Sequence, residues 1–281
     1  MVRSWHSFKT QLARAFTWRL PIRHMPKSEE GHLALAKEKL RRFLILADEI
    51  LSLRQAVQHR LGESFPSGTM QDTLRNRVLI GLNLKALDAF ERLVVDARDR
   101  RGESSHHLKT MAECFIYSHW ASRDLGEQRA RILYAEGCRS RAVYHENCSD
   151  SAEDAEHAVA WRELQRGQIS GIESDWSAFR DAGLQQLASQ AQLEDHYHKV
   201  YRLACEAAHM GDLMVYMPPQ PQEAGLTLAD LSLLRAYVSL KFGVILACDL
   251  LNDASDSLGM DAAGQIDGFR ERWRAVQSLT S

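Results

Sequence analysis

Apolar residues recur every three or four positions along almost the whole chain, and this spacing constrains the fold more than any other feature of the sequence. A period of this length places apolar side chains on one face of an α-helix. No segment combines period-two alternation with enrichment in β-branched residues, the pattern expected of half-buried strands. The sequence therefore predicts an all-α protein, a single multi-helix bundle of long antiparallel helices without a sheet.

Residues that start or stop helices divide this pattern into segments of unequal length. The longest helices are predicted at residues 28–61, 69–101 and 231–258. The second of these is expected to begin at Thr69, whose spacing from an acidic residue three positions later resembles a capping box. Residues 193–217 are predicted to form the helix around which the rest of the chain is organised.

The least apolar part of the chain lies at residues 145–171 and is expected to be exposed. Within it, Ser151 and Asp154 have the spacing of a helix start, so a polar helix is predicted from there to about Gly167. A short helix is expected to follow over residues 175–190.

The N-terminal residues 2–27 carry six basic residues and no acidic one. Their apolar positions fall on one helical face, which predicts a basic amphipathic helix. Such a helix fits a membrane surface, a partner protein, a transit peptide or an ordinary packed first helix. Residues 1–68 are therefore a candidate arm or subdomain, and residues 69–281 form the main helical domain.

Composition narrows the classes of function and location. The net charge of −2 gives no general attraction to nucleic acid or anionic membranes. The five cysteines are scattered and form no CxxC pair, which favours reduced thiols in a cytoplasmic protein. No apolar run is long enough to cross a bilayer, and no phosphate-binding loop or other cofactor motif is present. No cofactor and no resident metal are therefore expected.

A row of polar residues sets the helix predicted at 193–217 apart. Arg202, Glu206 and His209 stack on one side of it, beside the apolar stripe that includes Val200 and Leu203. Charges in such a position must be paired or hydrogen-bonded, because burial of an isolated charge is unfavourable by several kcal/mol. The pattern predicts a buried polar centre, for which an internal salt bridge is the simplest explanation.

Three segments carry a resemblance to a known family: HLKTMAECFIYSHWASRD, RARILYAEGCRSR and DWSAFRDAGLQQLASQAQLEDHYHKVYRLACEAAHMGD. Over roughly residues 75–220 the chain resembles the prokaryotic family called domain of unknown function 5677. The family's basic residue and glutamate match Lys109 and Glu113, although arginine is usual at the first position. Its second motif matches Tyr201, Cys205 and His209, with serine usual in place of the cysteine.

The resemblance implies a shared polar centre in which Glu113 joins Arg202 and His209 through two packed helices. Lys109, Tyr201 and Glu206 are the further candidate residues of this site. The family's frequent link with bacterial defence, including antiviral defence, is also only implied by the resemblance.

Three hypotheses for the polar centre stay open. An interaction or sensing module would use these residues to fix helix register, with a homodimer or another protein as partner. A metal-independent ribonuclease resembling HEPN toxins would use His209 as general acid or base and Arg202 against the RNA phosphate. A carboxylate-bridged metal site would draw on Glu206 and His209, with Glu113 or Glu91 from other helices.

Overall fold

The computed structural model describes residues 27–64, 73–101, 104–124, 126–147, 151–208, 228–258 and 261–280. Within these residues every regular element is a helix, and no strand is found among them. The predicted all-α class is therefore confirmed. The basic segment predicted at residues 2–27 lies, except for its last residue, outside the described ranges.

The helices follow one another in the chain with the bounds given next. They are α2 (Lys27–Ser64), α3 (Leu74–Asp99), α4 (Ser104–Ser122), α5 (Gln128–Asn147), α6 (Ala152–Ile169), α7 (Glu173–Asp181), α8 (Leu184–Gln190), α9 (Glu194–His196), the π-helical turn η1 (Tyr197–Tyr201), α10 (Arg202–Ala208), α12 (Leu228–Leu258) and α13 (Ala263–Ser278).

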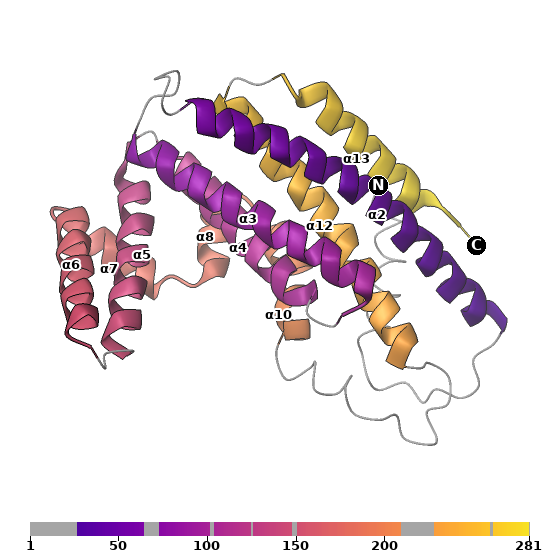
Figure 1. Cartoon of the computed structure of the whole chain (residues 1–281), viewed down its shortest axis with the longest axis horizontal. Helices are drawn as coiled ribbons and strands as arrows, with labels where there is room; N and C mark the ends of the chain where they lie inside the picture. Colours follow the sequence, from indigo (N-terminus) through magenta and orange to yellow (C-terminus); the bar gives the residue numbers. More distant parts are fainter. Residues whose placement is uncertain are drawn as a thin grey trace.

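Helix α12 lies at the centre of the bundle and contacts α2, α3, α4 and α13 (Figure 1). Its buried side chains point in every direction around its axis, because the run from Leu246 through Cys248 and the pair Leu250 and Leu251 are all fully buried. A helix that is apolar all round is stable only when other helices cover each side. The organising helix is therefore α12, and the expectation that residues 193–217 take this role is wrong.

The close approach of α3 to α12 depends on a glycine. A Cβ added at Gly243 would come within 3.1 Å of the Leu93 side chain. Both Leu93 and the neighbouring Phe90 are fully buried, so the surrounding core offers little room for adjustment.

Helices α2 and α13 cover the opposite side of α12. Phe43 and Ile50 of α2 are fully buried in the same apolar core as α12. On α13, the Trp273 indole donates a hydrogen bond of 2.7 Å to the carbonyl of Lys241. The amine of Lys39 donates to the carbonyl of Gln277 at 2.9 Å, which ties α2 to the end of α13. Residues 27–64 thus share one core with the C-terminal helices.

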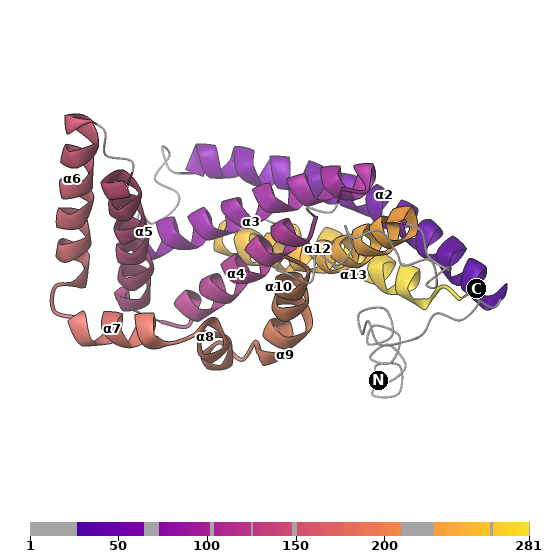
Figure 2. The ribbon, with the colours of Figure 1, turned by 90° about the horizontal axis from the view of Figure 1, so that it is seen from below.

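Helices α5 and α6 form an antiparallel hairpin, called here the α5–α6 hairpin, that stands to one side of the bundle (Figure 2). The predicted helix start is confirmed, since the Ser151 hydroxyl accepts a hydrogen bond of 3.1 Å from the amide of Asp154. On α6 the buried residues are Ala158 and Gln165, so this helix has too little apolar surface to join the bundle. The hairpin contacts the rest of the bundle through α5, which packs against α3 and α4.

Two helix boundaries differ from the predicted ones. The N-cap of α3 is Thr73, whose hydroxyl accepts from the amide of Asn76 at 3.2 Å, rather than Thr69. The single helix predicted over residues 175–190 is divided into α7 and α8, because the backbone is extended at Ala182 and Gly183. No described helix is long and apolar enough to cross a membrane. The described cysteines are free thiols.

One buried amine has an unusual electrostatic environment. Lys241 of α12 is only 5% exposed, and burial, together with the nearby charge of Lys39, lowers its pKa to about 7. The unfolded chain therefore binds more protons than the folded protein between about pH 7 and pH 10.5, and the free energy of unfolding should rise with pH over this window.

We expect Lys241→Met to raise the free energy of unfolding at pH 7 by about 1–3 kcal/mol, because it removes the penalty for burying an ionisable amine. The variant should also flatten the rise in stability from pH 7 to about pH 10. Urea denaturation across this pH range measures both effects. Lys37→Met, on the exposed face of α2, is the control and should leave the pH dependence unchanged. A loss of stability in Lys241→Met at pH 7 would contradict this expectation.

Candidate functional site

Apart from His209, the residues predicted to form the site come from α4 and from the segment η1–α10, and these helices are in direct contact. Glu113 of α4 lies 3.8 Å from the amine of Lys109, one turn earlier on the same helix. Burial raises the pKa of the Tyr201 hydroxyl, and interactions with Cys205 and Glu113 raise it further. The structure therefore brings together Lys109, Glu113, Tyr201 and Cys205, called here the Glu113 cluster.

The chemistry of the Glu113 cluster is that of a hydrogen-bonded contact between helices. Glu113 and Lys109 are each about one third exposed, at 34% and 29% of their side-chain surface. Burial also raises the pKa of the neighbouring Tyr117, again with a contribution from Glu113. Both tyrosines thus remain protonated at neutral pH, and the Tyr201 hydroxyl is placed to donate to the Glu113 carboxylate.

Arg202 does not share this contact, and the prediction that it lies in a buried centre is wrong. Its side chain is exposed, whereas Val200 and Ala204 are 5% and 1% exposed. Residues two positions apart point to nearly opposite sides of a helix. With the buried face formed by Val200 and Ala204, Arg202 must therefore face solvent.

A π-helical turn directly precedes Arg202. The amide of Arg202 donates to the carbonyl of Tyr197, five residues earlier, as a π-turn requires. The wider turn shifts the register between the residues that precede Arg202 and those that follow it. The rings of Tyr197 and Tyr201 stack within this segment, with centroids 5.3 Å apart.

The remaining predicted residues are only partly described. The backbone of Glu206 belongs to α10, but its side chain is outside the described set, and so is all of His209. Glu91, the other carboxylate considered for a metal site, accepts a hydrogen bond of 2.5 Å from Arg54 of α2 instead. Metal-independent RNA cleavage by Arg202 and His209 stays a prediction.

A second group of polar residues was not predicted from the sequence. His119 of α4 lies 3.4 Å from the carboxylate of Asp253 on α12, and Arg270 of α13 donates to Asp249 at 2.8 Å. The rings of His119 and His196 both pack against Phe115, with centroid distances of 4.3 and 5.1 Å. These polar residues from four helices are called here the His119 cluster.

Burial favours the neutral forms of two side chains in the His119 cluster. Burial raises the pKa of the Asp253 carboxyl, while the neighbouring His119 opposes the shift. Burial lowers the pKa of His196, with Asp249 opposing. Both shifts favour the neutral form of a half-buried group. The close approach of His119 to Asp253 joins α4 to α12, and the ion pair of Arg270 with Asp249 joins α13 to α12. His196 of α9 packs against Phe115 of α4.

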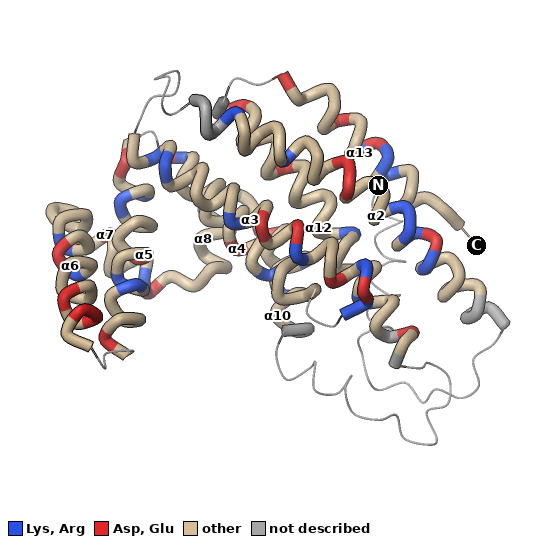
Figure 3. The backbone as a smooth tube through the Cα atoms, in the orientation of Figure 1, with Lys and Arg blue, Asp and Glu red and all other residues tan. Residues whose placement is uncertain are grey.

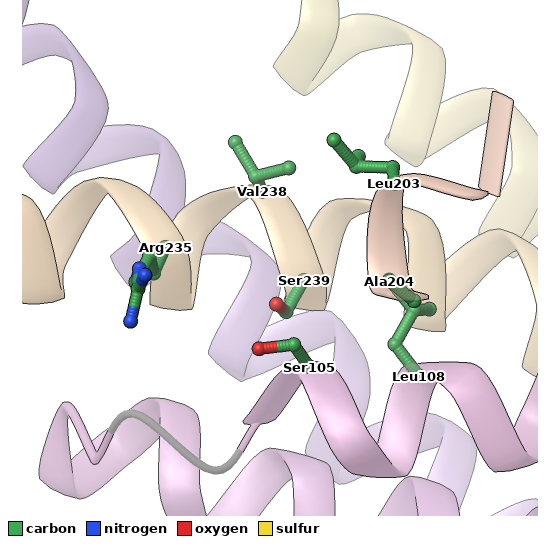
Figure 4. Close-up of a pocket in the computed structure, with 7 residues that line it drawn as sticks. All are labelled: Ser105, Leu108, Leu203, Ala204, Arg235, Val238 and Ser239. Atoms are coloured by element: carbon green, nitrogen blue, oxygen red, sulfur yellow. The ribbon is translucent and has the colours of Figure 1, made fainter. Parts of the chain in front are cut away.

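A small pocket opens beside the Glu113 cluster, where α10 meets α4 and α12 (Figure 4). Ser105 and Ser239 point toward each other in it, and Arg235 lies further along α12. Its other walls are apolar: Leu108, Leu203, Ala204 and Val238. The free space in the pocket is about 10 Å³, no more than one water molecule needs, so the pocket is too small for a cofactor.

Within the described part of the chain, one group of side chains has the composition and spacing of a metal site. His145, Asp154 and His157 each offer one ligand atom, and these atoms all lie within 4.8 Å of one another. The three residues, called here the hairpin-end cluster, lie where α5 ends and α6 begins. The sequence signal was the three-residue step from Asp154 to His157, but nothing in the sequence placed His145 beside it.

Comparison with known proteins adds no relative. No family model, no curated protein and no solved structure matches the chain. The resemblance to the family domain of unknown function 5677 thus stays a prediction.

The contact between Glu113 and Tyr201 can be measured by a double-mutant cycle. We expect Glu113→Ala and Tyr201→Phe to be coupled by about 0.5–1.5 kcal/mol in the free energy of unfolding, because each removes one partner of the same hydrogen bond. Urea denaturation of the wild type, both single variants and the double variant gives this coupling. Glu163→Ala, on the distant hairpin, should show no coupling to Tyr201→Phe. Strict additivity for the first pair would mean that these two side chains do not interact.

Proposed function

We propose that this protein is a helical interaction module without catalytic activity, and that it self-associates through the α5–α6 hairpin. One observation carries the proposal. Of the six large hydrophobic side chains that are exposed among the described residues, four lie on this hairpin: Tyr134, Tyr144, Val159 and Leu164. Exposed apolar side chains gathered on one element are typical of protein-binding surfaces.

The placement of the hairpin supports this role. It projects from the side of the bundle, so both of its helices are accessible to another molecule (Figure 2). Tyr144 and Val159 are 59% and 57% exposed, one on each helix. Tyrosine is enriched in interfaces because its rigid ring buries a large area and its hydroxyl still finds a partner.

The charges of the hairpin favour a second copy of the chain as the partner. Helix α5 has four arginines and two glutamates, a net charge of +2, and α6 has four acidic residues and two arginines, a net charge of −2 (Figure 3). If two hairpins pack so that α5 of each faces α6 of the other, opposite charges meet in both halves of a symmetric interface. The product would be a four-helix bundle formed by two chains.

The polar contacts inside the protein fit a structural role. The Glu113 cluster and the His119 cluster both join helices, and the pKa shifts within them favour neutral side chains. Charged groups that were arranged for proton transfer would instead be expected to have pKa values near neutrality and to open onto a cleft.

Self-association is tested by measuring the molar mass of the full chain with sedimentation velocity or light scattering over a concentration series. We expect a dimer in the wild type and a monomer in Val159→Glu and Tyr144→Glu, because a buried carboxylate without a partner opposes association. Ile45→Glu is the matched control, since Ile45 of α2 is 46% exposed but lies outside the hairpin. A monomeric wild type, or a dimer that survives both hairpin substitutions, would remove the proposal.

Metal-independent RNA cleavage is a second proposal, and the exposure of Arg202 favours it because a phosphate-binding arginine must be accessible. If it holds, the wild type cleaves RNA in the presence of EDTA, and Arg202→Ala lowers the rate at least about tenfold without changing the melting temperature. Gel analysis of a labelled RNA measures the rate, with Arg180→Ala as the control. An inactive wild type contradicts this second proposal.

A further inference from the structure

The two helices of the hairpin bring metal-binding side chains together where one ends and the other begins. His145 lies in the last turn of α5, and Asp154 and His157 lie in the first two turns of α6. Asp154 and His157 are three residues apart and so share one face of their helix. The Nδ1 atom of His145 lies 2.9 Å from Oδ1 of Asp154. This face of α6 is therefore turned toward His145.

The spacing of the ligand atoms fits a small transition-metal ion. Zinc bound at about 2.0–2.1 Å in a tetrahedral site holds its ligand atoms about 3.3 Å apart. The ligand atoms of His145 and Asp154 lie 2.9 Å apart, slightly closer than this ligand-to-ligand distance. No two of the three ligand atoms are more than 4.8 Å apart. Small rotations of the side chains would bring all three atoms onto one ion.

The carboxylate is already oriented for such a role. The Ser151 hydroxyl donates to Oδ2 of Asp154 at 2.8 Å, while Oδ1 faces His145. A second residue that fixes the orientation of a ligand is a regular feature of metal sites.

The position of His157 distinguishes this group from a simple ion pair between His145 and Asp154. The ring centroids of His157 and His145 are 5.1 Å apart, nearly edge to face. His157 is exposed, whereas His145 and Asp154 are half-buried. The site is thus closed on the hairpin side and accessible from solvent, which leaves room for a water molecule as a fourth ligand.

We propose that His145, Asp154 and His157 bind a zinc ion, with water completing a tetrahedral site. Two imidazoles and one carboxylate favour late first-row metals over calcium or magnesium, which prefer oxygen ligands alone. The ion would link the end of α5 to the start of α6. It would stabilise the hairpin, because it binds the folded arrangement of the three ligands and not the unfolded chain. The site does not depend on whether the hairpins associate.

The test uses the full-length chain without a histidine tag, treated with EDTA and then dialysed. Isothermal titration with zinc chloride at pH 7.5 should give one zinc per chain, and zinc should raise the melting temperature. Cobalt chloride should give the visible absorption of a tetrahedral site and should be displaced by zinc. Magnesium chloride should produce neither effect.

Substitution of the ligands separates this site from other histidines. His157→Ala removes an exposed ligand and should weaken zinc binding at least about tenfold, with loss of the cobalt absorption. Asp154→Asn should also weaken binding. His106→Ala, an exposed histidine on α4, is the control and should bind as the wild type does. The proposal is overturned if the wild type binds no zinc at about 100 µM, or if His157→Ala and His145→Ala both bind it unchanged.

Discussion

The burial of α12 on all sides is the constraint on which the rest of the structure depends. Its middle part, from Leu240 to Leu251, is almost entirely covered by α2, α3, α4 and α13. A helix segment with apolar side chains on most of its circumference is stable in water only when other helices surround it. Each neighbour needs only one apolar face of its own to take part. Gly243 then determines how near α3 can come, since a side chain there would meet Leu93.

Polar side chains are placed where surrounding helices meet one another. The Glu113 cluster joins α4 to η1 and α10, and the His119 cluster joins α4 to α12 and α13. Partial burial favours the neutral forms of Tyr201, His196 and Asp253, so these contacts require few buried charges. Helix α6 has too little apolar surface to join the bundle, and with α5 it forms the projecting hairpin on which the proposed association and metal binding both lie.

Much of the fold could be predicted because helices depend on local chemistry. The period of the apolar residues identified the all-α class, and the spacing of Ser151 and Asp154 identified a real N-cap. The cap of α3 was misplaced at Thr69, because several residues before Leu74 have suitable side chains and the sequence does not say which hydroxyl meets a free amide. For the site, the contact between Glu113 and Tyr201 was within reach of the sequence, since both residues were candidates. The exposure of Arg202 was not, because the sequence does not say that the neighbouring helices cover the face of Val200 and Ala204.

The sequence by itself determined which segments are helical and which of their faces are apolar, because both properties depend on residues only a few positions apart. Only the tertiary structure decided which helix occupies the centre and which polar residues meet. His119 and Asp253 are far apart in the chain, as are Glu113 and Tyr201, and they come together through packing of whole helices. His145 joins Asp154 and His157 only because the chain reverses between α5 and α6. Such contacts depend on the total burial of apolar surface by all the helices at once, and no short stretch of sequence specifies it.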